Sequence, residues 1–456
     1  MCSSDLAPRG PGPPLRVGAI RRIVVGAMGS RELTVAGVVE RMLGPDLPVA
    51  VEAYDGSRAG PIDAPARIVV RSPDALARIV RAPGELGLGR AYVSGELDVG
   101  GDLFLALAAL RERLPNVAVT PSAWLALARL VGPRALRPLP PPPEEARLSG
   151  RRHSRERDAR AIAHHYDVSN RFYRLVLGPS MTYSCAVWTS PEVSLEAAQE
   201  AKHELICRKL GLRPGMRLLD VGCGWGALAM HAAREHGVQA VGITLSRRQV
   251  EWASKAVAEA GLADRVEIRL QDYRDVEDGP FDAISSVGMF EHVGAGNLGR
   301  YFERLEALLR PGGRLLNHGI ARPAARGGRS RGGIPVTPAR LRRRSFVERY
   351  VFPDGELHEL GAVISVMQGR GFEVRHVESL REHYALTLRA WVANLEAAWD
   401  EAVAEVGPAR ARIWRLFMAA SALNFEAGRT QVHQVLAVKP ADGDSRMPLR
   451  PTSEGW

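Results

Sequence analysis

The segment Leu218–Gly226 (LLDVGCGWG) is the part of the sequence that most clearly indicates chemistry. It reads as a buried strand that ends in a glycine-rich turn, followed by an amphipathic helix over Ala227–His236. The glycines would let the backbone lie against a ligand without Cβ clashes, and the helix N-terminus would offer free N–H groups. Gly222 and Gly224 follow the acid Asp220 in a G-x-G-x-G spacing. This spacing favours S-adenosylmethionine over the nicotinamide dinucleotides, which take G-x-G-x-x-G.

The second strand of this region, residues 238–243, places polar side chains where a nucleoside could bind. It is followed by Thr244, Leu245 and Ser246, with Gln249 one turn into the next helix. Most nucleotide-binding α/β enzymes have a carboxylate here for the ribose hydroxyls. This chain has none, so the Thr244 backbone, Ser246 or Gln249 would have to substitute for it.

The third strand, residues 265–270, leads to Gln271 and Asp272. The Asp272 carboxylate could accept a hydrogen bond from an adenine amino group. The alternative is architectural, because Ser246 could simply cap a helix and Asp272 could simply begin a turn. The glycine-rich turn upstream favours the cofactor interpretation.

The elements that must position these residues alternate between strand and helix, which indicates an α/β fold with a doubly wound, Rossmann-like parallel sheet. The pattern predicts strands at residues 218–222, 238–243, 265–270, 281–287, 313–318 and 435–438. Long helices are predicted before the last strand, over residues 386–406 and 409–425.

A smaller α+β domain is predicted over residues 31–136, with no polar cluster of catalytic type. Its expected elements are helices at 32–43, 73–81 and 102–114 and strands at 49–54 and 66–70. Residues 137–160, which begin RPLPPPP and continue with charged residues, read as a linker because proline runs are stiff and join a core poorly. The cofactor domain would then span residues 161–440, and residues 441–456 would be a disordered tail.

Composition narrows the class of partner. The net charge is +10 with a pI near 9.8, which favours an anionic partner, either nucleic acid or an acidic membrane surface. The four cysteines have no C-x-x-C spacing, so a disulfide framework is excluded and a reducing cytosol fits best. No apolar run reaches the roughly 18 residues that span a bilayer. Residues 1–30 read as a disordered or mis-started leader, with Met28 as an alternative start.

Four further motifs occur in a fixed order over about residues 160–440. They are His165–Tyr173 (HYDVSNRFY), Met181–Ala186 (MTYSCA), Gly288–Gly294 (GMFEHVG) and Phe346–Gly355 (FVERYVFPDG). Together they resemble the cyclopropane-fatty-acyl-phospholipid synthases and the mycolic-acid cyclopropane synthases. Gly84–Val99 (GELGLGRAYVSGELDV) resembles the small domain of the same enzymes and of actinobacterial relatives that methylate oleoyl chains at carbon 10, and we therefore interpret the small domain as lipid-associated.

The resemblance implies methyl transfer from S-adenosylmethionine to the cis double bond of a phospholipid acyl chain. An alkene is a weak nucleophile, so the enzyme must hold it against the sulfonium methyl in a dry apolar pocket. The resulting carbocation is stabilised by aromatic faces, and a base must then remove a proton to close the ring. In the family this base is a bound bicarbonate ion, and the matching residues are Cys185, Glu291, His318, the Ile320 backbone and Tyr384. The residues that match the family's cofactor contacts are Tyr166, Tyr183, Ser184, Gly222, Gly224, Thr244, Leu245, Gln249 and Gln271.

Taken singly, each of these residues has an ordinary structural alternative. Cys185 could be a small core residue, Glu291 could begin a helix, His318 could be a hydrogen-bonded buried histidine, and Tyr384 could be a core residue at the rim. Read together within the motifs, the functional interpretation is favoured. His164, His165 and His292 form no complete metal-ligand set, and we expect no metal.

Two features depart from the family pattern. A cysteine in the C-terminal helix of these enzymes corresponds here to Ser421, and a carbocation route does not need that cysteine. The segment Ala321–Arg344 contains eight arginines. It reads either as a disordered insertion or as a polybasic contact to anionic lipid headgroups.

The product stays open between two outcomes. The matched bicarbonate set favours a cyclopropane, whereas Ser421 and the small domain are compatible with a 10-methylene lipid, the precursor of tuberculostearic acid. Other classes are an RNA methyltransferase, for which no aromatic-lined basic groove is evident, and a non-catalytic lipid-binding paralogue, which would be expected to lose the glycine turn or Glu291. We expect a cytoplasmic enzyme on the inner face of the membrane that binds no nucleic acid. A homodimer is compatible with the sequence, as is a reductase partner for the methylene product.

Overall fold

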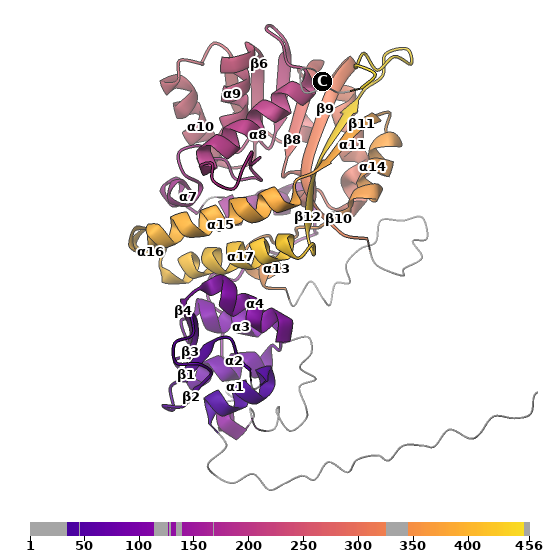
Figure 1. Cartoon of the computed structure of the whole chain (residues 1–456). Coiled ribbons are helices and arrows are strands. Elements are labelled where there is room, and N and C mark those ends of the chain that lie inside the picture. The colour runs from indigo at the N-terminus through magenta and orange to yellow at the C-terminus, as the bar shows by residue number, and fades with distance from the viewer. Residues whose placement is uncertain are drawn as a thin grey trace, which may run out of the picture.

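The computed structural model of the chain describes residues 34–44, 46–113, 126, 129–133, 139–166, 168–324 and 345–450. The predicted leader, most of the arginine-rich segment and residues 451–456 lie outside these ranges. Figure 1 shows a small domain at one end of the molecule and a larger α/β domain at the other.

The small domain packs helices on a four-stranded sheet with the order β2-β1-β3-β4. Strands β1 and β3 are parallel, and the outer pairs are antiparallel. The strands are β1 (Ala50–Ala53), β2 (Arg58–Ala59), β3 (Ala66–Val70) and β4 (Leu97–Gly101), and the helices are α1 (Val35–Leu43), α2 (Pro73–Arg81), α3 (Glu85–Val93) and α4 (Leu103–Arg113). The predicted helix at 73–81 and strand at 66–70 are confirmed, whereas β2, β4 and α3 were not predicted.

The larger domain is built on a sheet with the order β11-β12-β9-β8-β5-β6-β7, and β10 pairs with β9 off this path. Its strands are β5 (Arg217–Val221), β6 (Gln239–Thr244), β7 (Val266–Leu270), β8 (Phe281–Val287), β9 (Leu309–Arg322), β10 (His358–Glu359), β11 (Glu373–Ser379) and β12 (Gln431–Val438). Strands β5 to β9 are mutually parallel, whereas β12 runs antiparallel to both of its neighbours. The doubly wound α/β fold is therefore confirmed, with one antiparallel strand where a wholly parallel sheet was predicted.

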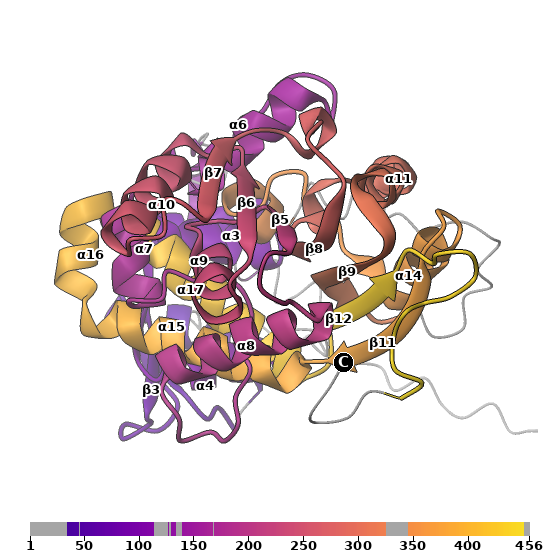
Figure 2. The ribbon, with the colours of Figure 1, turned by 90° about the horizontal axis from the view of Figure 1, so that it is seen from above.

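Chain order reverses between β5 and β8, because β6 and β7 extend the sheet to one side and β8 and β9 to the other. In doubly wound folds the ligand crevice lies at this switch point, outside the carboxyl ends of the strands. Helices α8, α9 and α10 lie over one side of the sheet, and α11 and α14 lie over the other (Figure 2). These helices are α8 (Leu195–Leu210), α9 (Ala227–His236), α10 (Arg247–Glu259), α11 (Leu298–Leu308) and α14 (Leu360–Gln368).

Helices α15 (Arg381–Ala397) and α17 (Pro408–Glu426) lie side by side between the sheet and the small domain, with α16 (Trp399–Val406) joining them (Figure 1). The single long helix predicted over 386–406 is thus two helices, which meet at Ala398. Helices α6 (Arg155–Tyr166), α7 (Asn170–Leu177) and α13 (Phe346–Tyr350) complete the described helices. One apolar cluster runs from the small domain through α7 to α15 and α17, so the two domains share a core.

The segment predicted as a linker is more ordered than expected. Glu145 is buried and pairs with Arg90 of the small domain and Arg349 of α13, and α6 begins at Arg155. A buried carboxylate needs such partners, and the composition of the segment does not reveal them. The predicted tail is likewise partly structured, because Ala441 and Asp444 exchange backbone hydrogen bonds.

The arginine-rich segment begins later than predicted. Ala321 and Arg322 end β9, where both pair with β10, and Arg322 also forms an ion pair with Glu359. The other arginines of the segment lie outside the described residues.

Candidate active site

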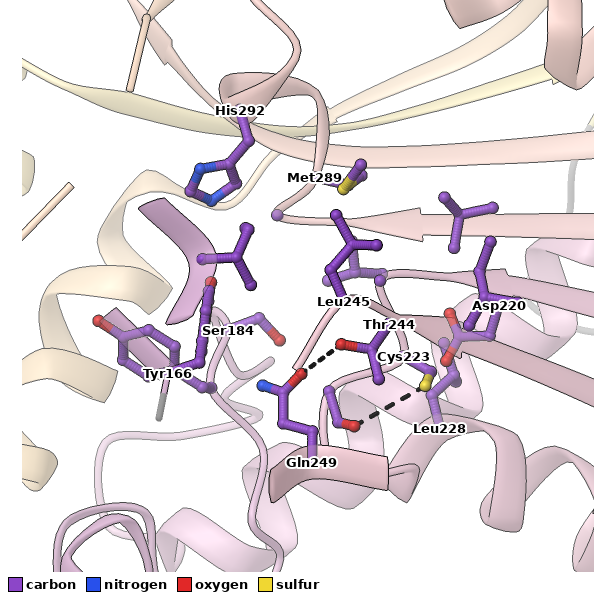
Figure 3. Close-up of a pocket in the computed structure, with 18 of the residues that line it drawn as sticks. Tyr166, Ser184, Asp220, Cys223, Leu228, Thr244, Leu245, Gln249, Met289 and His292 are labelled. Carbon is purple, nitrogen blue, oxygen red and sulfur yellow. Dashed lines mark hydrogen bonds between the residues drawn. The ribbon is translucent and has the colours of Figure 1, made fainter. Parts of the chain in front are cut away.

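A pocket opens at the switch point of the sheet, lined by the glycine-rich turn and by the residues that follow β6, β7 and β8 (Figure 3). Of the residues predicted to contact the cofactor, eleven line it: Tyr166, Tyr183, Ser184, Asp220, Gly222, Gly224, Thr244, Leu245, Gln249, Gln271 and Asp272. The pocket thus gathers residues from strand ends that are far apart in the sequence.

The glycine-rich turn adopts a backbone that favours glycine. Gly222 has φ +77°, Gly224 has φ +57°, and Gly226, which caps α9, has φ +84°. A Cβ atom added at Gly224 would have no heavy atom within 4 Å, although Gly224 lines the pocket. The turn therefore leaves open space in front of bare backbone, as close approach of a cofactor requires.

Asp220 is buried at the end of β5 and accepts a hydrogen bond from Ser285 Oγ at 2.7 Å. Burial raises the pKa of this carboxyl to about 6, although Ser285 and the nearby Lys202 favour its ionised form. Asp220 thus lines the pocket as a carboxylate that titrates near neutral pH.

Lys202 of α8 also lines the pocket, and the sequence analysis did not single it out. Its side chain is buried and donates a hydrogen bond from Nζ to Ser184 Oγ at 3.0 Å. Burial lowers the pKa of this amine to about 7. The available signal was its place on the buried stripe of α8, between Ala198 and Ile206, where a lysine is rare.

We expect Lys202→Met to weaken S-adenosylmethionine binding by about tenfold or more, because it removes a cation that lines the pocket and holds the pocket-lining Ser184 hydroxyl, and a charge-assisted hydrogen bond is worth about 1.5–3 kcal/mol. Isothermal titration calorimetry at pH 6.5 measures the change. Lys209→Met is the matched control, since Lys209 is equally buried on the same helix but contacts Glu378 and Gln434. Equal affinity losses in both variants would contradict a specific role for Lys202.

The polar residues after β6 divide into two groups. Thr244 donates a hydrogen bond from Oγ1 to Gln249 Oε1 at 2.6 Å, within the pocket wall (Figure 3). Ser246 does not line the pocket, and its buried hydroxyl accepts from the backbone N–H of Gln249 at 3.2 Å. Ser246 is therefore the N-cap of α10 and holds the first turn, which carries Gln249.

Gln271 and Asp272, the two residues after β7, differ in which of their side-chain atoms lack a hydrogen-bond partner. Gln271 donates to the Asp275 carbonyl at 2.8 Å, and its buried Oε1 has no hydrogen-bond partner. Asp272 is the cap of a short turn and also forms an ion pair with Arg274, while it lines the pocket. Because a buried amide oxygen without a donor is costly, Gln271 fits a ligand that carries an amino group, such as adenine.

Tyr166 and Tyr183 line the pocket, and aromatic contacts run from them to residues outside it. Tyr166 lies edge-on to Tyr183, with ring centroids 6.1 Å apart, and Tyr183 lies 5.2 Å from Trp391 of α15. Tyr384 continues the series, edge-on to Trp391 at 6.0 Å. The cofactor pocket therefore adjoins an apolar region that α6 and α15 shape.

The residues that match the family's bicarbonate set lie behind the pocket, none of them among its lining residues. Glu291 is buried in the turn after β8 and accepts from the Ile320 backbone N–H at 2.6 Å. The backbone N–H of Ile320 is therefore already used within the protein. The other oxygen of Glu291, Oε2, is buried without a partner, and burial raises the pKa of this carboxyl to about 7.

A chain of hydrogen bonds fixes the ring orientation of His318 on β9 and determines which ring nitrogen carries the proton. Lys209 Nζ donates to Gln434 Oε1 at 2.7 Å, which turns the Gln434 amide nitrogen toward His318 Nδ1, 3.2 Å away. Nδ1 is then an acceptor, so the proton lies on Nε2, which is buried without a partner. Burial, with Lys202 and Lys209 nearby, lowers the pKa of His318 to about 3 and keeps the ring neutral.

Cys185 and Tyr384 complete the set. The Cys185 thiol is buried and donates to the carbonyls of Ala186 and Leu380, at 3.2 and 3.6 Å. Burial raises the pKa of Cys185 well above its usual value, so it stays a thiol. A negative charge on either Cys185 or Glu291 would raise the pKa of the buried Tyr384 hydroxyl, so both groups lie near it. Within this set, His318 Nε2 is a buried donor and Glu291 Oε2 is a buried acceptor, and neither atom has a hydrogen-bond partner.

Comparisons with known proteins agree with this geometry. Residues 153–435 match the family model for mycolic acid cyclopropane synthetase. A probable fatty acid methyltransferase of Mycobacterium tuberculosis, Rv3720, is 48% identical over 89% of this chain and 94% of its own length. The tuberculostearic acid methyltransferase UfaA1 of the same organism is 34% identical over 91% of this chain and 93% of its own.

Among solved structures, the mycolic acid cyclopropane synthase CmaA1 in complex with S-adenosylhomocysteine (SAH) and CTAB is 35% identical, with a TM-score of 0.57. The match covers 61% of this chain and 97% of that one. The family match covers more than half of the chain and includes the glycine-rich turn, Glu291 and His318. The chain is an S-adenosylmethionine-dependent methyltransferase and belongs to the mycolic acid cyclopropane synthetase family.

Proposed function

We propose that this enzyme transfers a one-carbon unit from S-adenosylmethionine to the cis double bond of an unsaturated acyl chain in a membrane phospholipid and forms a cyclopropane ring. The observation that carries the proposal is that two residues of the family's base-binding set, Glu291 and His318, each keep a buried polar atom, Oε2 and Nε2, without a protein partner. Water-free surroundings suit the reaction of a weak alkene nucleophile.

The aromatic residues support the carbocation step. Tyr166, Tyr183, Trp391 and Tyr384 form a continuous wall, and burial raises the pKa of the three phenols, so they stay neutral. Neutral aromatic faces stabilise a cation without capturing it as a covalent adduct. Cys185 is a candidate nucleophile in this set of residues, and burial raises its pKa, which keeps it a thiol.

The proton that leaves the substrate needs an acceptor, and the buried groups fit a bicarbonate ion. The ion would supply the base. Glu291 Oε2 would accept the hydrogen bond from its hydroxyl, and His318 Nε2 would donate to one of its oxygens. This division of roles requires an ionised Glu291 and a neutral His318. The pKa values of about 7 and about 3 are compatible with that requirement above neutral pH.

Access to phospholipid would come from the membrane surface. Among the described residues, no helix is both long and apolar enough to traverse a bilayer. The net charge of +10 supports attraction to anionic headgroups, and we propose that the protein works on the inner face of the cytoplasmic membrane. The small domain packs against α17, one of the two helices that cover the apolar region, which is compatible with a role in admitting the acyl chain.

A second product has comparable support. The identity to UfaA1, a tuberculostearic acid methyltransferase, is 34%, and the identity to the cyclopropane synthase CmaA1 is 35%. Methyl transfer to the alkene is common to both outcomes, and the difference is where the cation loses its proton. A 10-methylene product would need a separate reductase to become a 10-methyl chain.

The test is to incubate the protein with S-adenosylmethionine and vesicles of dioleoyl phosphatidylglycerol, then to analyse the released fatty acids by gas chromatography and mass spectrometry. We expect the oleoyl chain to gain the mass of one CH₂ unit. Ozonolysis separates the isomers, because it cleaves an exocyclic methylene and leaves a ring intact. Methylation of added RNA with no change in the lipid would overturn the proposal.

A further inference from the structure

Outside the active site, one cluster of side chains has the composition of a metal centre. Cys207 of α8 lies beside His231 and His236 of α9, and one potential ligand atom from each lies within 4.8 Å of the other two. We propose that this cluster, with Glu204, binds a zinc ion that joins α8 to α9.

Glu204 is the fourth candidate ligand because it contacts both histidines, although it is not part of the group of three whose ligand atoms lie within 4.8 Å of one another. Its Oε2 lies 3.3 Å from His231 Nε2 and 2.9 Å from His236 Nε2. Ligands of tetrahedral zinc at bond lengths of about 2.0–2.1 Å are separated from one another by about 3.3 Å, so these contacts already approach the edges of such a tetrahedron. One thiolate, two imidazoles and one carboxylate are ligand types that zinc takes.

Helix geometry explains why the residues converge. Glu204 and Cys207 are three residues apart on α8 and therefore share one face, and α8 packs against α9. His231 is within α9 and His236 is its last residue, so their side chains reach the same α8 face from one side. This arrangement cannot be recognised as a sequence motif, because the ligands come from two separate helices.

Access and burial fit a structural site. The Cys207 side chain is buried, while the side chains of His231, His236 and Glu204 are 6%, 17% and 40% exposed. An ion could enter from the Glu204 side and would then be enclosed by four protein ligands. A closed set without an open position is typical of a structural zinc site, not a catalytic one.

The consequence of zinc binding would be mechanical. Helix α8 carries Lys202 into the cofactor pocket, and α9 begins at the last glycine of the glycine-rich turn. An ion between α8 and α9 would fix the position of Lys202 relative to the glycine-rich turn. We therefore expect zinc to raise the melting temperature of the chain, while turnover at low temperature changes little.

The test uses the untagged full-length protein, purified with a chelator and a reducing agent. We expect it to bind one equivalent of Zn²⁺ in calorimetry. Co²⁺ should produce the intense visible bands of a tetrahedral site and the near-ultraviolet band of a thiolate ligand.

Cys207→Ser should remove the thiolate band, and His236→Gln, at the more exposed ligand, should weaken zinc binding by more than about tenfold. His376→Gln, on β11, is the matched control and should bind zinc as the wild type does. Absence of binding in the wild type, or equal zinc affinity in all four proteins, would overturn the proposal. In the latter case the cluster would be only a carboxylate that accepts from two histidines.

Discussion

Replacing Glu291 by glutamine is expected to lower turnover by about 10²–10⁴-fold, the range that positioned acid–base groups contribute. The glutamine oxygen can still accept from the Ile320 N–H, but the side chain would present an N–H donor where Glu291 Oε2 is a free acceptor. Cofactor affinity should be unchanged, because Glu291 does not line the cofactor pocket. Steady-state kinetics and calorimetry measure the two effects separately.

The same variant should be more stable than the wild type. Burial raises the pKa of Glu291 from 4.5 to about 7, so the folded state resists ionisation that the unfolded chain undergoes freely. The wild type therefore loses stability as pH rises from about 4.5 to 7, and the full penalty of about 3 kcal/mol is present above pH 7. Glutamine does not ionise, so Glu291→Gln should unfold at higher temperature at pH 8 and at a similar temperature at pH 4.

Glu356→Gln is the matched control for both readouts. Glu356 is 7% exposed, as Glu291 is, but its Oε2 accepts from the Ala295 backbone N–H. We expect this variant to keep most of its turnover. Wild-type turnover in Glu291→Gln, or lost cofactor binding, would show that the carboxylate is not part of the deprotonation site.

The second large effect concerns the cofactor. Gly224→Ala should reduce S-adenosylmethionine affinity by about two orders of magnitude, equivalent to about 2.7 kcal/mol, because the added methyl group would stand in the space left for the ligand. The unliganded protein offers no atom for that methyl to meet within 4 Å. Isothermal titration calorimetry gives the affinity.

Gly261→Ala isolates the backbone cost. Gly261 has φ +66° against +57° for Gly224, and its Cβ would also have open space, but it lies in the turn after α10, outside the pocket. Both variants should lose about 1–2 kcal/mol of stability from the left-handed backbone. Only Gly224→Ala should lose cofactor affinity, and equal affinity in the two variants would refute a close approach at Gly224.

Much of the larger domain could be predicted because its strands are buried runs that local patterns reveal. Residues 281–287 form β8 and residues 227–236 form α9 within the predicted limits. The small domain was harder because tertiary contacts decide it. Helix α3 contains Gly87 and Gly89, where an added Cβ would lie 2.3 Å from the Ala82 carbonyl oxygen and from the Phe346 ring, so these glycines permit close packing.

The residues of the candidate site likewise include some that local motifs reveal and others that only tertiary packing determines. Residues within the recognised motifs reach one pocket, because the carboxyl ends of parallel strands meet at one edge of the sheet. The pattern around Ser246 left two interpretations open, because capping a helix and binding a ribose require the same residue type, and the structure shows the cap. The chain from Lys209 through Gln434 to His318 could not be foreseen, since it depends on how α8 packs on the sheet.

The most direct test of the central claim is mass spectrometry of oleoyl phospholipid incubated with S-adenosylmethionine that carries a trideuterated methyl group. The account predicts an acyl chain that gains one carbon with two of the three deuteriums and resists ozonolysis. This result would establish methyl transfer, loss of a proton from that same carbon, and ring closure. No label in the lipid, while the protein still binds the cofactor, would contradict the claim that the acyl double bond is the substrate.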